Sequence, residues 1–163
     1  MSLMIDTKIF ENSIKNYEKK FSSAIKDSLY DVGLRIVVDA VTKPPKAPIL
    51  DGFLTGSFWV AVTNREIMKP ENFPSPGDVG KNTKRKLHDA SLVDPDVSDM
   101  TKYELRVGNA MIYARRLHEN PFIPGEWSEK RGGVGYKFLS SKLSMYRNEY
   151  LRLLAGFIKK RMK

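Results

Sequence analysis

The sequence contains no cysteine among its 163 residues and only two histidines. The lack of cysteine excludes disulfides, thiolate zinc sites, iron–sulfur clusters and cysteine nucleophiles. Long hydrophobic runs are lacking too, because the longest, 58–62 and 153–158, fall far short of the ~20 residues that a membrane-spanning helix needs. The first residues have no basic stretch leading into an apolar region. We therefore expect neither a secretory signal nor a membrane segment.

Recognisable catalytic patterns are missing as well. His118 and Glu119 are adjacent, but a zinc-protease helix requires a second histidine at position 122, where the chain has Phe122. His88 is far away in the sequence. The Gly-x-Ser-x-Gly pattern of serine nucleophiles does not occur. We expect no catalytic residue, no metal, no cofactor and no small-molecule substrate.

A glycine-rich run, residues 131–138, superficially resembles a phosphate-binding loop. In such a loop the lysine is followed by serine or threonine, which holds magnesium, whereas Lys137 is followed here by Phe138. We interpret the run as a flexible hinge before the last helix.

Composition predicts a single domain, 1–163, since 41% of the residues are apolar and 29% are charged. The net charge of +9 is concentrated near the C-terminus. Residues 1–100 hold 14 basic and 14 acidic side chains, whereas residues 101–163 hold 14 and 5. This basic third suits an acidic protein surface or nucleic acid. The candidate contacts are the two basic clusters Lys84, Arg85, Lys86 and Lys159, Lys160, Arg161.

Hydrophobic spacing predicts two long helices. Apolar residues from Phe10 to Ile36 recur at steps of three and four, and Pro44 ends this first helix. Asp6 or Thr7 is expected to cap its start, and Gly33 to weaken its last turns. The same helical period reappears from Leu139 to Phe157.

Between the helices, alternation and turn residues predict two strands and a long loop. We expect strands at 58–63 and 102–107, the second with one buried and one solvated face. A mobile polar loop is predicted at about 66–100, a short helix at 110–118 capped by Asn109, and another loop at 119–135. The fold class is α+β, with a small antiparallel sheet packed against the two long helices. Because two strands make a marginal sheet, further strands are expected from loops or neighbouring subunits.

Three short stretches resemble the tailed-bacteriophage tail-completion, or head–tail joining, proteins, which are often described as minor capsid proteins. That family typically has Ala-Pro, two residues, Thr-Gly, one residue, Leu, two residues and Ser, and residues 47–57 follow this pattern with Asp51 in place of the threonine. Val107-Gly108, Tyr113-Ala114 and Glu119 resemble the family's strand and Tyr-Ala helix, although the usual Gly-Thr after the glutamate is missing. Lys137-Phe138-Leu139 resembles its entry into the last helix. The motif residues are Pro48, Asp51, Gly52, Leu54, Ser57, Tyr113, Ala114, Glu119, Phe138 and Leu139.

The resemblance implies a non-enzymatic virion protein of a phage or prophage, which forms a homo-oligomeric ring at the neck and contacts a connector or tail-tube protein. It implies residence in the virion, and in the host cytoplasm during assembly. Gly52 is then expected to allow the turn before the strand, and Tyr113 to anchor the short helix on the sheet. We expect the loops 66–100 and 119–135 to contact partners.

Two alternatives stay open at this point. The first is a nonspecific nucleic-acid-binding protein of a mobile element, which uses the basic C-terminal third. The second is a hydrolase or nuclease with an unrecognised site.

Overall fold

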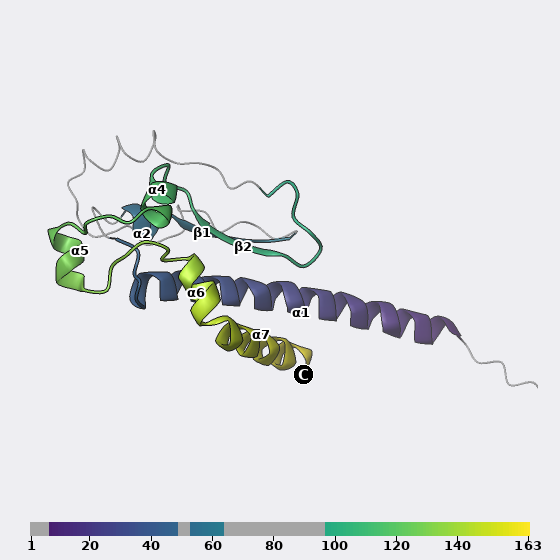
Figure 1. Ribbon diagram of the computed structural model, residues 1–163. Helices are drawn as coiled ribbons and strands as arrows, with labels where there is room; N and C mark the ends of the chain where they lie inside the picture. The colour runs from purple at the N-terminus through teal and green to yellow at the C-terminus, as the bar shows by residue number, and fades with distance from the viewer. Residues whose placement is uncertain (1–6, 49–52, 64–96) are drawn as a thin grey trace, which may run out of the picture.

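The predicted N-terminal helix is α1, Thr7–Thr42, and it runs along the whole molecule (Figure 1). This computed structural model describes residues 7–48, 53–63 and 97–163. The helix ends just before the two prolines, as predicted, with the Lys43 backbone N–H donating to the Asp39 carbonyl at 2.9 Å. Asp6, one of the two expected caps, lies outside the described residues.

A two-stranded antiparallel sheet lies across one face of α1. β1, Phe58–Val62, pairs with β2, Leu105–Asn109, and Val60 stands opposite Val107. Gly33 marks the crossing, because a Cβ there would lie 2.5 Å from Val60 Cγ1 and 2.8 Å from Leu105 Cδ1. The glycine that we expected to weaken the helix therefore allows the close approach of helix and sheet. Packing against a helix is one way in which so small a sheet gains stability.

The predicted pattern of the second strand is wrong in two respects. β2 begins at Leu105 rather than at residue 102, and all five of its residues are half-buried. β2 therefore has no fully buried face that alternates with a fully solvated one.

The predicted C-terminal helix is split in two. α6, Ser140–Met145, and α7, Arg147–Met162, meet at Tyr146, whose φ of −113° and ψ of 15° depart from helical values. α7 then runs antiparallel to α1 on the side away from the sheet (Figure 1). The break at Tyr146 changes the direction of the chain, so that α7 lies alongside α1.

Three short helices lie near the C-terminal end of α1 (Figure 1). They are α2, Phe53–Gly56, α4, Ala114–Glu119, and α5, Glu126–Arg131. The sequence predicted α4 to begin at residue 110, and it predicted a loop where α5 lies. Asn109 does not cap α4, because Tyr113 occupies that position; the Asn109 side chain instead accepts a hydrogen bond from the Met111 backbone N–H at 3.0 Å.

The glycine-rich run is tied to the segment that follows α1. Lys46 donates its backbone N–H to the Gly133 carbonyl at 2.7 Å and accepts from the Gly135 N–H at 3.1 Å. Gly132 and Gly133 have φ values of 65° and 67°, a region that favours glycine. The glycines therefore lie in a turn that is hydrogen-bonded to the segment after α1. The interpretation of this run as a flexible hinge did not include this contact.

The core has two parts, one on each side of α1. Toward the sheet and the short helices, the buried side chains include Val37, Ala40, Leu54, Phe58, Val60 and Phe138. Toward α7, Val32, Ile36 and Tyr150 pack with Leu153, Leu154 and Phe157. The predicted α+β class is confirmed, with a small antiparallel sheet and a long helix at each end of the chain. Most of the predicted loop 66–100 lies outside the described residues.

Candidate functional site

The N-terminal half of α1 projects beyond both the sheet and α7 (Figure 1). Every residue from 8 to 21 is exposed. Its apolar side chains remain on the surface: Phe10 is 67% exposed, Ile14 44%, Tyr17 63% and Phe21 41%. We call residues 8–21 the arm. At 1.5 Å per residue, the arm is about 20 Å long.

The apolar face of the arm continues the face of α1 that α7 covers. Phe10, Ile14, Tyr17 and Phe21 follow one another at steps of four, three and four, which leads along the helix to the buried Val32. α7 ends near the middle of α1, where Arg161 pairs with Asp31. The same helix face is therefore core in one half and surface in the other.

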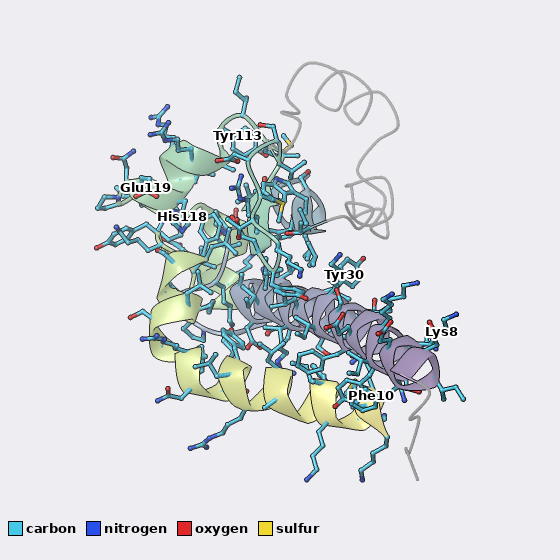
Figure 2. The ribbon with its side chains drawn as sticks, turned by 90° about the vertical axis from the view of Figure 1, so that its right-hand side faces the viewer. Lys8, Phe10, Tyr30, Tyr113, His118 and Glu119 are labelled. Carbon is cyan, nitrogen blue, oxygen red and sulfur yellow. The ribbon has the colours of Figure 1, made fainter. Side chains whose placement is uncertain are left out.

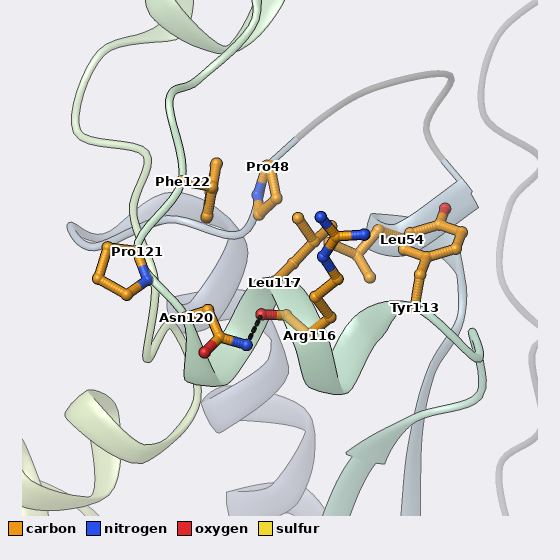
Figure 3. Close-up of a pocket in the computed structure, with 8 residues that line it drawn as sticks. All are labelled: Pro48, Leu54, Tyr113, Arg116, Leu117, Asn120, Pro121 and Phe122. Carbon is orange, nitrogen blue, oxygen red and sulfur yellow. Dashed lines mark hydrogen bonds between the residues drawn. The ribbon is translucent and has the colours of Figure 1, made fainter.

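A pocket of about 550 Å³ lies beside α4, at the end of the molecule opposite the arm (Figure 3). Figure 2 shows the same separation, with Phe10 at one end of α1 and Tyr113 near the other. The pocket has the size of a ligand-binding cavity. Its walls come from the segment after α1, from α2, from α4 and from the chain that follows α4. The apolar lining consists of Pro48, Leu54, Tyr113, Leu117, Pro121 and Phe122.

Asn109, at the end of β2, holds α2 and α4 in place around this pocket. Its side-chain amide donates to the Leu54 carbonyl at 2.6 Å, while its carbonyl oxygen accepts from the Met111 N–H. The Ala110 N–H also donates to the Ser57 carbonyl at 2.8 Å. The end of the sheet therefore fixes the spacing of the two pocket walls.

The polar part of the pocket is formed by Arg116 and Asn120. The Asn120 side chain and backbone both donate to the Arg116 carbonyl, at 3.2 Å and 3.1 Å, and this closes the C-terminal end of α4. Arg116 and its neighbour Arg115 are exposed. The mouth of this apolar pocket is therefore positively charged.

The motif residues gather around this pocket and the core beneath it. Pro48 and Ser57 are buried, Leu54 is 3% exposed, Ala114 6% and Phe138 1%. Tyr113 and Leu139 pack against the same cluster, while Glu119 is exposed. Asp51 and Gly52 lie outside the described residues, so the structure does not describe the expected turn. Tyr113 packs beside α2 rather than standing on the face of the sheet (Figure 3).

His118 links α4 to α6. Its Nδ1 lies 2.7 Å from Glu119 Oε1, its Nε2 accepts from the Ser140 backbone N–H at 3.2 Å, and its ring meets the Phe138 ring edge-on at 4.9 Å. The hydrogen bond with His118, followed by the charge of Lys137, lowers the pKa of Glu119. With both ring nitrogens engaged, His118 is placed for structure rather than for proton transfer.

A buried polar cluster, centred on Asp39, joins α1 to α7. Asp39 is 1% exposed and accepts from the Tyr150 hydroxyl at 3.0 Å, from Arg35 Nε at 3.2 Å and from Lys43 Nζ at 3.1 Å. Burial and the hydrogen bond to Asp39 raise the pKa of Tyr150. The cluster satisfies a buried carboxylate where the two helices meet.

Lys142 is fully buried next to this cluster. Its Nζ donates to the Pro45 carbonyl at 2.9 Å, and burial lowers its pKa. It therefore fastens α6 to the chain reversal after α1. The helical period placed Lys142 on the outer, basic face of the last helix, and the break at Tyr146 explains why the residue lies inside.

The predicted basic contacts have different surroundings. Lys159 and Lys160 are exposed on α7, whereas Arg161 is half-buried, pairs with Asp31 and donates to Ser28 Oγ at 3.3 Å. Lys84, Arg85 and Lys86 lie outside the described residues. Arg161 thus holds α7 against α1.

Comparisons with models of protein families, with curated proteins and with solved structures found no match for this chain. Along the residues that the structure describes, no group of three acidic, histidine or cysteine side chains is arranged to hold a metal ion. Among the helices of those same residues, none combines the length and apolar character needed to cross a membrane.

Sequence reasoning missed the pocket and the exposure of the arm. Leu117, Pro121 and Phe122 were assigned to a short helix and a loop, and nothing in their spacing indicated a shared cavity with Pro48. One signal was present: Phe122, an aromatic residue, lies in a proline-bounded loop segment.

Proposed function

We propose that this chain is a non-enzymatic structural protein of a tailed phage or prophage, which joins head and tail by assembling as a ring of identical copies. The observation that carries the proposal is the arm, in which four large apolar side chains on one helix face remain exposed. Contiguous apolar surface of this kind marks contact with another macromolecule. The ring would bind a connector or tail-tube protein, in the host cytoplasm during assembly and then in the virion.

The placement of the motif residues supports the same proposal. The stretch at 47–57, the Tyr-Ala helix and the Phe-Leu entry into α6 are far apart in the sequence. In the structure they contribute to one core cluster beside one pocket, from Leu54 to Ala114 to Phe138. A resemblance carried by residues that pack together is stronger than one carried by unrelated surface positions.

Deletion of the gene from its phage or prophage tests the function directly. We expect lysates in which DNA-filled heads and complete tails accumulate separately under the electron microscope. Adding the purified protein should join them. The Ile14→Asp variant should fail to join them, while Gly156→Ala, which changes an exposed position on α7, should act like the wild type. Complete, infective particles from the deletion strain would overturn the proposal.

A second candidate function, nonspecific nucleic-acid binding, is favoured by one observation: Lys159 and Lys160 are exposed on a helix that also presents Arg152. Each lysine that contacts phosphate adds about 0.9 to the slope of log affinity against log salt. Binding to a duplex would therefore weaken steeply with salt and with Lys159→Glu. Retention of DNA together with unimpaired head–tail joining in the deletion strain would favour this alternative.

A further inference from the structure

The arm requires a receiving surface, and the pocket beside α4 has a suitable shape and charge. We infer that the arm of one copy docks into the α4 pocket of the next copy, with its aromatic side chains in the cavity. This inference rests on the proposed function, because it names the contact through which the ring would form. It concerns one occupant only, a second copy of this chain.

The shapes of the two surfaces are complementary. The arm is a convex helix with large side chains at Phe10, Ile14, Tyr17 and Phe21, which is the spacing of helices that bind in apolar grooves. The pocket is concave and apolar, and its volume of about 550 Å³ is large enough for aromatic side chains. Two further exposed apolar residues, Ile112 and Ile123, directly precede and follow lining residues in the sequence.

The charges are complementary as well. Glu11 and Glu18 are seven residues apart and flank the same side of the apolar stripe. The arm also carries Lys8, Lys15, Lys19 and Lys20, of which the first three lie farther from the apolar stripe and Lys20 lies on its other flank. At the pocket, Arg116 lines the wall, and Arg115 is exposed beside it. An acidic edge on the arm therefore meets a basic edge on the pocket, which fixes the orientation of docking.

Pairing of two arms fits the charges less well. In an antiparallel pair related by a two-fold axis, the same flank of each helix meets, which brings Glu11 and Glu18 close to the same residues of the other copy. In a parallel pair, Glu18 faces Ser13 and gains no opposite charge. The pocket beside α4, in contrast, offers the acidic flank a cationic partner together with an apolar cavity.

The positions of the two surfaces make the contact heterologous, which means that two different patches of identical copies meet. The arm is the N-terminal part of α1, whereas α4, which lines the pocket, lies near the other end of α1 (Figure 1), so one copy cannot fill its own pocket. A head-to-tail contact between different patches leaves one free arm and one free pocket until a ring closes. This is the geometry that a ring requires.

Site-specific cross-linking tests the inference, because the chain has no native cysteine. Tyr17→Cys places one thiol on the arm, and Asn120→Cys places one at the pocket. With a short bismaleimide, we expect each single variant to remain uncross-linked and their mixture to yield one heterodimer. A chain with both substitutions should give a ladder that ends at a closed ring. Pro121→Cys provides a second pocket position in case Asn120→Cys disturbs the end of α4.

The control is Leu151→Cys, which lies on the exposed side of α7 and is 52% exposed. Its mixture with Tyr17→Cys should not cross-link. Cross-linking of Tyr17→Cys with itself would identify an arm–arm dimer and overturn the inference. The inference would also fall if neither pocket position cross-linked to the arm. If head–tail joining persisted in that case, the proposed function would stand and only the docking site would be wrong.

A charge exchange provides the second test. One variant has Glu11 and Glu18 changed to lysine, and the other has Arg115 and Arg116 changed to glutamate. Each variant alone should self-associate at least about tenfold more weakly than the wild-type chain. A mixture of the two reversed chains should recover the lost affinity, because the opposite charges are restored at the same contact. Equal weakening in the mixture would contradict the proposed orientation.

Discussion

The two halves of α1 carry one apolar pattern in two different surroundings. From Ala24 to Thr42 the helix lies between the sheet and α7, with Val32 4% and Ile36 2% exposed. From residue 8 to 21 the same periodicity continues, and every residue is exposed. Spacing identifies the apolar face of a helix, but the rest of the chain decides how far along the helix that face is covered. The uncovered half is where we place the contact with other copies.

The largest predicted difference between the halves concerns a charge on the apolar face. Ile36→Asp places an unpaired carboxylate in the core and should cost at least about 4 kcal/mol, enough to prevent folding of a marginal domain. Ile14→Asp should change the unfolding free energy of the isolated chain by less than about 0.5 kcal/mol. Urea denaturation of dilute protein, followed by circular dichroism, measures both. Similar losses at the two positions would mean that the arm is part of the folded core.

The buried cluster supplies the next largest effect. Asp39→Ala leaves the buried Tyr150 hydroxyl without its acceptor and removes the partner of Arg35 and Lys43, and it should cost about 1–3 kcal/mol. Glu149 approaches the same two cations at 3.9 Å and 3.7 Å but is 45% exposed, so Glu149→Ala should cost less than about 1 kcal/mol. The same urea titration compares them. An equal effect of both substitutions would show that burial of Asp39 is not what makes this cluster strong.

Two glycines provide a matched pair on the two long helices. A methyl group at Gly33 would meet Val60 and Leu105, and the cost of overpacking, about 1–3 kcal/mol, exceeds the helix-propensity gain of about 1 kcal/mol. Gly156 has no atom within 4 Å of a built Cβ, so Gly156→Ala should raise stability by up to about 1 kcal/mol. Thermal unfolding curves should shift in opposite directions. A stabilised Gly33→Ala variant would contradict the close crossing of α1 and the sheet.

The smallest effect concerns the Tyr150 hydroxyl. Tyr150→Phe removes its hydrogen bond to Asp39 and should cost about 1 kcal/mol near neutral pH. The pKa of Tyr150 is raised in the folded chain, so its contribution is present below the unfolded value of about 10 and is lost as the pH rises above it. The wild type should therefore lose stability more steeply than the variant above about pH 10. Parallel pH profiles would show that the hydroxyl is not buried beside Asp39.

The sequence was a good guide to the elements whose side chains repeat over many turns. The stripe from Phe10 to Ile36 predicted α1, and the run of aromatic and β-branched residues at 58–62 predicted β1 almost to the residue. The predicted α+β fold class followed from these helices and strands. The break at Tyr146 was not visible, because the apolar spacing continues through it without interruption.

The candidate site was less accessible to prediction, because it depends on tertiary contacts. The pocket brings Pro48 beside Leu117 and Phe122, and Asn109 sets the spacing through bonds to Leu54 and Met111. The burial of Asp39 and Lys142 was equally hidden, since charged residues within helices are usually solvated. The sequence did predict the apolar stripe of the first helix; only the structure divided it into a buried part and an exposed part.

The most direct test of the arm as an assembly surface is the mass of the wild-type chain and of Ile14→Asp by sedimentation equilibrium, at the highest concentration at which both stay soluble. We predict oligomers for the wild type and monomers for Ile14→Asp, with the same unfolding midpoint in dilute solution. A wild-type chain that stays monomeric, or a variant that forms the same oligomers, would contradict the account.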